Sequence, residues 1–205
     1  PLHIPMGGWQ EVQYLSRQIT SLVEATHGHT LVLFTSYKLM GAVYQQVKDV
    51  LKFPLFEVWR NGAAALGEFK KSGNGVLFAA GSCWEGVDFP GDMVSSLILP
   101  RLAFPVPNPL SQAEQNQFPS LDAYLQEVIV PDMQVKLRQG FGRAIRSETD
   151  TCVVSLLDQR ATADGRYHRA ALEALPTVPV TERVEDVAEF ILNRKQPDYF
   201  GATPM

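Results

Sequence analysis

The segment 139–146, QGFGRAIR, carries the side chains best suited to chemistry on an anion. Placed on a helix at about 100° per residue, Gln139, Gly142, Arg143 and Arg146 fall within one third of the circumference. Arginine keeps its charge and binds phosphate oxygens through two N–H groups, and glycine leaves room for another group to come close. The pattern therefore favours a polyphosphate site built from one carboxamide and two guanidinium groups.

The same arginines have a second interpretation, which the spacing leaves open. Arginine pairs three positions apart are common on helix surfaces, where solvent or carboxylates such as Glu148 and Asp150 compensate their charge. Two glycines within three helical positions nevertheless cost up to about 1 kcal/mol each against alanine. Such a local loss of helix propensity is typical of positions whose residues serve a function other than helix stability.

A second polar group lies in the loop 81–92, GSCWEGVDFPGD, directly after a predicted buried strand. Ser82, Glu85 and Asp88 stand there among three glycines, so backbone N–H groups and carboxylates could face a ligand. The structural alternative is a long turn with Trp84 as its hydrophobic plug. A dozen residues exceed what a turn requires, and this favours a functional loop.

Thr35 and Ser36 form a third candidate site, directly after the apolar run 30–34. Their place before a helical pattern favours a helix N-cap. The same hydroxyls, together with the unpaired N–H groups of a helix N-terminus, can also hold a phosphate without reading a base. Both interpretations predict a helix that begins at this point.

These residues sit in an alternation of short apolar runs and amphipathic stretches. Such an alternation predicts right-handed βαβ crossovers and a parallel, three-layer α/β sheet, in which ligands bind beyond the carboxyl ends of the strands. We expect all the polar loops at that edge. Strands are predicted at 30–34, 55–59, 76–80, 94–99 and 151–157, and helices at 9–27, around 40–51, 63–69, 120–146, 166–174 and 183–194. Residues 101–119 hold four prolines and predict an extended excursion that leads into a helix.

Composition limits the kind of protein. At 205 residues with 45% hydrophobic residues, one globular domain is expected, and a net charge of -4 excludes a protein that holds nucleic acid by bulk positive charge. Two distant cysteines favour a reducing cytoplasm over a disulfide scaffold. We expect no membrane helix and no signal peptide, and the first residue, Pro1, hints at a fragment or a processed product.

Several motifs that would complete a catalytic site are missing from the 205 residues. The sequence contains no GxxxxGK[ST] P-loop, no DEAH-like acidic box, no HExxH and no GxSxG, and its four histidines show no metal-ligand spacing. No GxGxxG joins the first strand to its helix, which disfavours a dinucleotide-dependent oxidoreductase. Arginines suited to a γ-phosphate are therefore present without the elements that bind the nucleotide.

In this order and context, the motifs resemble those of the second motor domain of superfamily 2 DNA helicases of the XPD/DinG type. LVLFTSY at 31–37, GSCWEGVDFPG at 81–91 and QGFGRAIRSETD at 139–150 are similar to motifs IV, V and VI of that family. LDQR at 157–160 resembles a segment that often follows motif VI. The likeness covers nearly the whole chain from about residue 9.

The resemblance implies a RecA-like, P-loop NTPase-type fold for residues 1–205, with a lead-in helix at 9–28 and a proline-rich excursion at 101–130. It also implies that ATP and Mg²⁺ bind in a cleft shared with an N-terminal motor domain of the same parent protein, which carries the P-loop. On that basis Arg146 is expected to be the arginine finger and Arg143 a second γ-phosphate contact. Gln139 is expected to be a partner of the phosphates or of the attacking water.

Further roles follow from the resemblance alone. Asp88, Glu85 and Gly142 are expected to bind the nucleotide or to couple its state to the DNA grip. Single-stranded DNA is the expected partner, held at its phosphates without reading its sequence. The candidates for those phosphate contacts are Thr35, Ser36 and Ser82.

The sequence also departs from the family. Cys83 stands where many relatives have an aromatic residue, and Trp59-Arg60-Asn61-Gly62 stands where a Gln-Gly pair is frequent. The family's iron–sulfur cluster needs four cysteines, and two cannot hold one. The resemblance predicts the motor domain of an ATP-dependent, 5′→3′ DNA helicase with a role in repair, inactive as an isolated chain. The alternative is a non-catalytic RecA-like interaction module.

Overall fold

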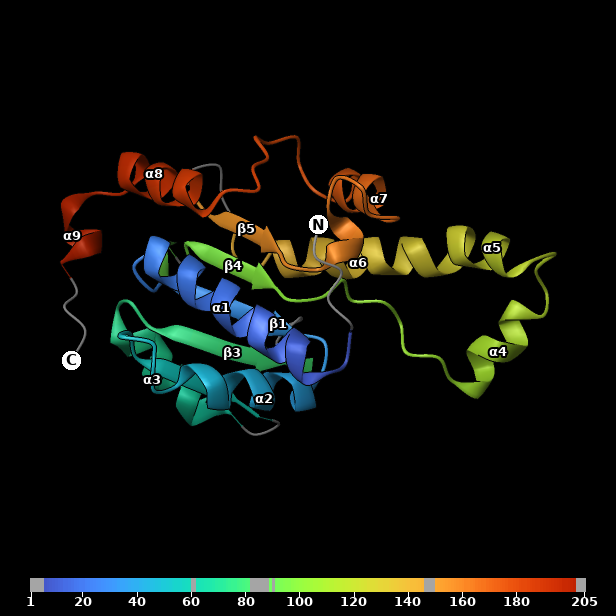
Figure 1. Ribbon diagram of the computed structural model, residues 1–205, viewed down its shortest axis with the longest axis horizontal. Helices are drawn as coiled ribbons and strands as arrows, with labels where there is room; N and C mark the ends of the chain where they lie inside the picture. Colours follow the sequence, from blue (N-terminus) through green and yellow to red (C-terminus); the bar gives the residue numbers. More distant parts are fainter. Residues whose placement is uncertain (1–5, 60–61, 82–88, 90, 146–149, 202–205) are drawn as a thin grey trace.

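The computed structural model describes residues 6–59, 62–81, 89, 91–145 and 150–201, and its centre is a sheet of five parallel strands. The strand order is β2-β3-β1-β4-β5, with every neighbouring pair parallel (Figure 1). This confirms the parallel α/β sheet predicted from the sequence. The strands are β1 (Thr30–Phe34), β2 (Leu55–Val58), β3 (Val76–Ala80), β4 (Ser96–Leu99) and β5 (Val153–Leu156).

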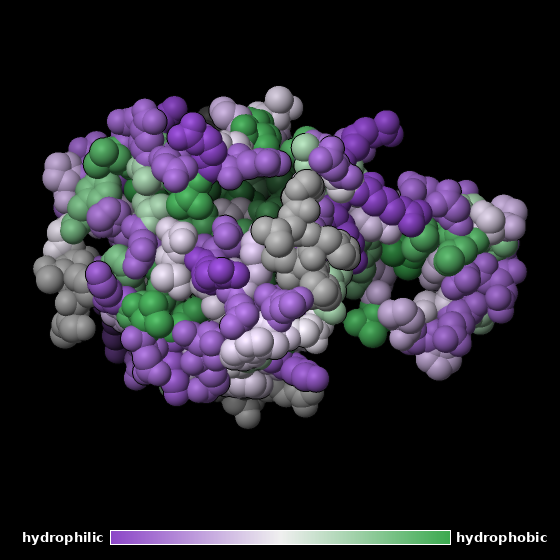
Figure 2. Space-filling view, viewed as in Figure 1, coloured by the Kyte–Doolittle hydropathy of each residue, from purple (hydrophilic) through white to green (hydrophobic). Residues whose placement is uncertain are grey.

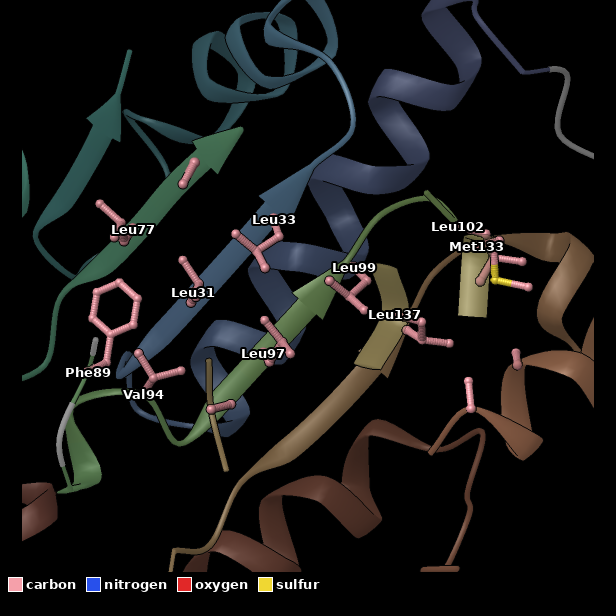
Figure 3. Close-up of a cluster of buried hydrophobic side chains, with 14 of the residues drawn as sticks. Leu31, Leu33, Leu77, Phe89, Val94, Leu97, Leu99, Leu102, Met133 and Leu137 are labelled. Carbon is pink, nitrogen blue, oxygen red and sulfur yellow. The ribbon is translucent and has the colours of Figure 1, made fainter. Parts of the chain in front are cut away.

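Helices cover both faces of the sheet, because the side chains of its central strands are apolar on both sides. Val32 and Phe34 of β1 join the core under α1 (Trp9–Ala25), α2 (Tyr37–Val47) and α8 (Val184–Arg194). Leu31 and Leu33 join the core on the opposite face, where α3 (Ala63–Ser72), α6 (Val130–Phe141) and α7 (His168–Glu173) pack. Figure 3 shows this second core, with Met133 and Leu137 of α6 facing the strands.

Local sequence explains where the first two helices end and begin. Helix α1 gives way to a tight turn in which His27, Gly28 and His29 all have positive φ, as the histidine–glycine pattern predicted. Ser36 caps α2, since its Oγ accepts a hydrogen bond from the N–H of Leu39 at 3.2 Å. The capping role predicted for Ser36 is therefore confirmed.

The helix predicted at 120–146 is observed as a helical stretch that ends earlier. It comprises α5 (Leu121–Tyr124), a π-helical turn η3 (Leu125–Ile129) and α6, and Pro131, which has no N–H, lies just after the π turn. Helix α6 ends at Phe141, and Gly142 to Ala144 form turns. The prediction was wrong for residues 142–145, because glycine favours a helix end over a helix interior, and residue 146 lies outside the described part of the chain.

The proline-rich segment contains a helix where only an extended chain was expected. Helix α4 (Pro109–Gln115) begins with a capping box, in which Asn108 accepts from the N–H of Ser111 and the Ser111 hydroxyl accepts from the N–H of Asn108. Figure 1 shows α4 and α5 standing out to one side of the sheet. Short helical turns complete the described elements: η2 (Gly91–Met93), η4 (Gln159–Ala161) and α9 (Pro197–Phe200).

Candidate functional site

The structure divides the candidate residues into two groups on different parts of the sheet. Thr35 and Ser36 follow the carboxyl end of β1, whereas Gln139, Gly142 and Arg143 lie at the C-terminal end of α6, which leads into β5. Val135 and Lys136, about one turn before Gln139 on α6, line the same cavity as Thr35 and Gly81. The expectation that the polar loops lie at the carboxyl edge stays a prediction for motif VI.

Gln139 and Arg143 lie side by side at the end of α6, although not on a regular helix. The Nε of Arg143 donates to the backbone oxygen of Gln139 at 3.2 Å. The N–H groups of Gly142 and Arg143 donate to the carbonyls of Arg138 and Gly140, both at 3.0 Å, which tightens the turn. Ala144 is buried and anchors the segment, so the guanidinium of Arg143 is held against the backbone of Gln139.

The carboxamide oxygen of Gln139 is an unsatisfied acceptor. Its Oε1 atom is buried without a hydrogen-bond partner among the residues that the structure describes. A buried acceptor left in this state costs about 1–3 kcal/mol, so such groups usually have a water or a ligand as partner. Gln139 is thus poised to accept a hydrogen bond from a group that approaches the end of α6.

Gly142 lies in a turn where a side chain could be accommodated. Its φ is -63°, and a Cβ added there would lie 3.5 Å from the oxygen of Arg138 and 3.6 Å from that of Gln139, which is ordinary van der Waals contact. Neither backbone strain nor the described neighbours require a glycine. The close approach of a ligand to Gly142 stays a prediction.

At the carboxyl edge, an aromatic stack closes the end of β3. Gly81 has a φ of 64°, and a Cβ there would lie 2.6 Å from the hydroxyl of Tyr37. The ring of Tyr37 stacks on Trp59, with centroids 5.4 Å apart and an angle of 14° between the planes. Thr35 beside this stack is exposed. The edge therefore presents one exposed hydroxyl next to a preformed aromatic surface.

A cavity of about 400 Å³ opens between this edge and α6. Strand ends, the segment after β4 and the first turns of α6 all contribute walls, so the cavity joins the two halves of the fold. Its lining comprises Phe34, Thr35, Gly81, Ala103, Phe104, Pro105, Asp132, Val135 and Lys136. No local sequence pattern predicts this cavity, because its walls come from segments that are distant along the chain.

An ion pair behind the cavity fixes the chain after β4. Asp158 accepts from the N–H of Leu102 at 2.8 Å and pairs with the guanidinium of Arg160 at 2.6 Å. Burial alone raises the pKa of Asp158, but the hydrogen bonds from Arg160 and Leu102 outweigh it and lower that pKa. Arg160 in turn lies over the ring of Phe104, 4.7 Å from its centroid. The sequence identifies the LDQR segment only by its resemblance to a segment of the family, whereas the structure shows how it packs.

The amino edge of the sheet is closed by a polar network. The ring nitrogens of His29 lie 3.0 and 3.2 Å from the carbonyl oxygens of Asp92 and Tyr199. Lys195, which is buried, donates to Asp92 at 2.5 Å and to the oxygen of Thr151 at 2.8 Å. These contacts join four segments that are distant along the chain, and no local sequence signal could have revealed them.

Other predicted residues fall outside the described part of the chain. Arg146, Ser82, Glu85 and Asp88 belong to this group, so their roles stay predictions. Within the described ranges, no group of three His, Cys, Asp or Glu side chains is placed to hold a metal ion. No described helix has the length and apolarity to cross a membrane.

Sequence comparisons identify relatives over most of the chain. Residues 19–178 match the family model described as a helicase C-terminal domain. The chain is 32% identical to ATP-dependent DNA helicase YoaA of Escherichia coli over 86% of its own length and 28% of the relative's. It is 36% identical to ATP-dependent DNA helicase DinG of Photobacterium profundum, and 31% identical to a Bacillus subtilis protein named 3′-5′ exonuclease DinG. Those two alignments cover 77% and 87% of this chain, but only 24% and 20% of the relatives.

Structural comparisons agree on the fold. A solved structure of XPD without ligand superposes with a TM-score of 0.68 and 19% identity, covering 84% of this chain and 36% of that one. Yeast Dbp5 bound to RNA and ADP–BeF3 superposes with a TM-score of 0.54 and 14% identity, covering 90% and 42%. The sheet is therefore that of a RecA-like helicase domain. With the family model matched over most of its length, the chain belongs to the helicase C-terminal domain family of DinG- and XPD-type helicases.

Proposed function

We propose that this chain is the second motor domain of an ATP-dependent, 5′→3′ DNA helicase. In this proposal, ATP binds to a first motor domain with a P-loop, and this chain supplies the groups that face its γ-phosphate. The observation that carries the proposal is the pairing of Gln139 with Arg143 at the end of α6, in a sequence without a P-loop. The DNA helicase relatives and the family match support it.

Arginine charge is the first contribution to the ATP site. Arg146 would act as the arginine finger, and Arg143 would form a second contact to the γ-phosphate oxygens. Charge develops on those oxygens in the transition state, and an arginine finger contributes about 10³–10⁵ to the rate of phosphoryl transfer. Asp88 and Glu85 of motif V would couple the state of the nucleotide to the DNA grip.

The chemistry of Gln139 favours the attacking water as its partner. An amide oxygen only accepts hydrogen bonds, and phosphate oxygens at neutral pH have few protons to donate. A water between Oε1 of Gln139 and the γ-phosphate could donate to the buried acceptor, which would orient its lone pair for attack. Gly142, which carries no side chain, would let the nucleotide reach this end of α6.

In this proposal, Mg²⁺ binds only together with the nucleotide. It would neutralise phosphate charge when bound. The described residues contain no group of three metal-ligating side chains, so we assign its ligands to the first motor domain and derive no step from them here.

The carboxyl edge would hold single-stranded DNA by its phosphates. Thr35 is exposed beside the N-terminus of α2, an eleven-residue helix whose first N–H groups point to this edge. Ser36 already accepts from Leu39 through its Oγ, so it would contribute through its N–H or its hydroxyl proton. Ser82 would complete the set. Such contacts position a strand and do not read its sequence.

Phosphate release by the isolated chain tests the proposal that the ATP site is divided. With ATP, Mg²⁺ and single-stranded DNA, we expect no turnover above the buffer, because the P-loop and acidic box are absent. Robust turnover that disappears in Arg146→Ala would contradict the proposal, since the chain would then hold a complete site.

A further inference from the structure

The cavity at the carboxyl edge has the size and walls of a ligand site. Its volume of about 400 Å³ lies within the range of roughly 300–1,000 Å³ typical of small-molecule pockets. Phe34, Ala103, Phe104 and Pro105 make most of the wall apolar, and Val135 extends it. Among the described residues, the polar groups of the lining are contributed by Thr35, Asp132 and Lys136. A flat, largely apolar group with polar edges suits such a cavity.

The aromatic wall is fixed before any ligand binds. Phe104 contacts the guanidinium of Arg160, 4.7 Å from its centroid, and the ring of Tyr167, 4.8 Å away at 53°. Asp158 holds Arg160 through two oxygens. Because these side chains are already held in place, they lose little conformational entropy when a ligand binds. Little of the free energy gained by contact with the wall is therefore lost in ordering it.

Thr35 connects the cavity to the proposed DNA path. It lines the cavity, and it is also the exposed hydroxyl at the start of α2. A nucleotide whose phosphate contacts Thr35 therefore has its base close to the opening. The carboxylate of Asp132 repels a second phosphate, but it can accept a hydrogen bond from an N–H on a base edge. The ammonium of Lys136, which also lines the cavity, can pair with a phosphate, so the lining accommodates a base beside Asp132 and the backbone beside Lys136.

We propose that this cavity takes one nucleobase of the bound single strand. The inference rests on the proposed DNA-binding function and deepens it. Every base has an apolar face, so stacking or packing against Phe104 would tolerate any sequence. Val135 and Lys136 precede Gln139 on α6 by about one turn. A base in the cavity would therefore contact the same helix that presents Gln139 to the nucleotide.

Filling the cavity tests this proposal without removing any packing. Val135 is 45% exposed, so Val135→Trp would place an indole at the cavity with little cost in stability. Val180→Trp, at a position 65% exposed between α7 and α8, is the matched control. Binding of the 205-residue chain is measured by fluorescence anisotropy at low salt, with an oligothymidylate and with a strand of equal length whose bases are removed. Thermal unfolding confirms that each variant is folded.

We expect the wild-type chain to bind the oligothymidylate at least about fivefold more tightly than the abasic strand. Val135→Trp should bring the two affinities within about twofold of each other by weakening only the oligothymidylate, and Val180→Trp should behave as wild type. Equal wild-type affinities, or discrimination that survives Val135→Trp, would overturn the base pocket and leave the DNA-binding proposal standing. If neither strand binds, the proposed DNA-binding function itself fails, and the base pocket with it.

A competition experiment separates a base of the strand from a free nucleotide. Thymidine 5′-monophosphate at millimolar concentration should leave the oligothymidylate bound, because it lacks the neighbouring phosphates that Thr35 and the helix N-terminus would hold. If the free nucleotide displaces the strand and Val135→Trp abolishes that displacement, the cavity is a mononucleotide site and the proposal is overturned.

Discussion

At the amino edge of the sheet, the ring of His29 lies between two carbonyl oxygens and buried Lys195 contacts Asp92, whereas at the carboxyl edge Thr35 is exposed beside a cavity. Both edges consist of loops with polar residues. At the amino edge these groups satisfy one another across distant segments. At the carboxyl edge, apolar walls and a few polar groups stay accessible. The cavity of about 400 Å³ at the carboxyl edge is larger than the one of about 260 Å³ that His29, Asp92 and Tyr199 line at the amino edge.

The arm formed by residues 105–124, which carries α4 and α5, also differs from the amino edge. Val106, Leu110 and Leu121 on this arm are exposed, and Figure 2 shows hydrophobic surface there, away from the main body. At the amino edge, His29 and Lys195 are buried, whereas the side chain of Asp92 is 58% exposed. The molecule thus keeps its adaptable surfaces at one end and a rigid, satisfied network at the other.

Replacing one glycine at each edge by alanine should show the largest difference between the edges, measured as the loss in the free energy of unfolding. Gly28 and Gly81 both have positive φ, at 79° and 64°. A Cβ at Gly28 would lie 1.9 Å from the backbone oxygen of Asn74, but one at Gly81 meets only the tip of the Tyr37 side chain. We expect Gly28→Ala to lower the free energy of unfolding by about 3 kcal/mol or more, and Gly81→Ala by about 1–2 kcal/mol. Urea denaturation measures both. Equal losses would show that the amino edge is no more rigid than the other.

A smaller effect should appear in the pH dependence of stability. Burial lowers the pKa of His29, although hydrogen bonds to Tyr199 and Asp92 and the charge of Asp92 oppose it; Lys195 nearby lowers it further. The unfolded chain then binds more protons as the pH falls through about 6.5, so stability is full above that value and declines below it.

His29→Gln should remove this component, which amounts to at most about 1.4 kcal/mol per pH unit. The measurement is the midpoint of urea denaturation between pH 7.5 and 5.5, about one unit either side of the ordinary histidine pKa. His168→Gln is the control, since that side chain is partly exposed and its Nδ1 donates one hydrogen bond to the carbonyl oxygen of Ala161. If wild type and His29→Gln share one slope, the buried ring does not titrate with folding.

Sequence reasoning succeeded where local pattern decides the structure. The runs TLVLF and VLFAA, apolar on both faces, became the buried strands β1 and β3, and Ser36 became the cap of α2. Periodicity also located the helices of both layers. Boundaries failed where a single residue outweighs the pattern, as at Gly142, where the helix ends before Arg143.

The site was less predictable than the fold, because distance along the chain hides its parts. Gln139 and Arg143 are close in sequence, and their pairing follows from it. The cavity needs β1, β3, the segment after β4 and α6 together, and the amino-edge network joins His29 to Tyr199 across most of the chain. Such contacts form only when the whole sheet is assembled, so no local motif predicts them.

The most direct test of the divided ATP site joins this chain to a P-loop motor domain of the same family and measures ATP turnover with single-stranded DNA. Arg143→Ala should lower kcat by about 10³-fold or more with little change in thermal stability, since the guanidinium is partly exposed and acts on the phosphate. Arg138→Ala, one turn earlier on α6 and exposed, should leave kcat within about twofold of wild type. Unchanged kcat in folded Arg143→Ala, or an equal loss in Arg138→Ala, would contradict the account.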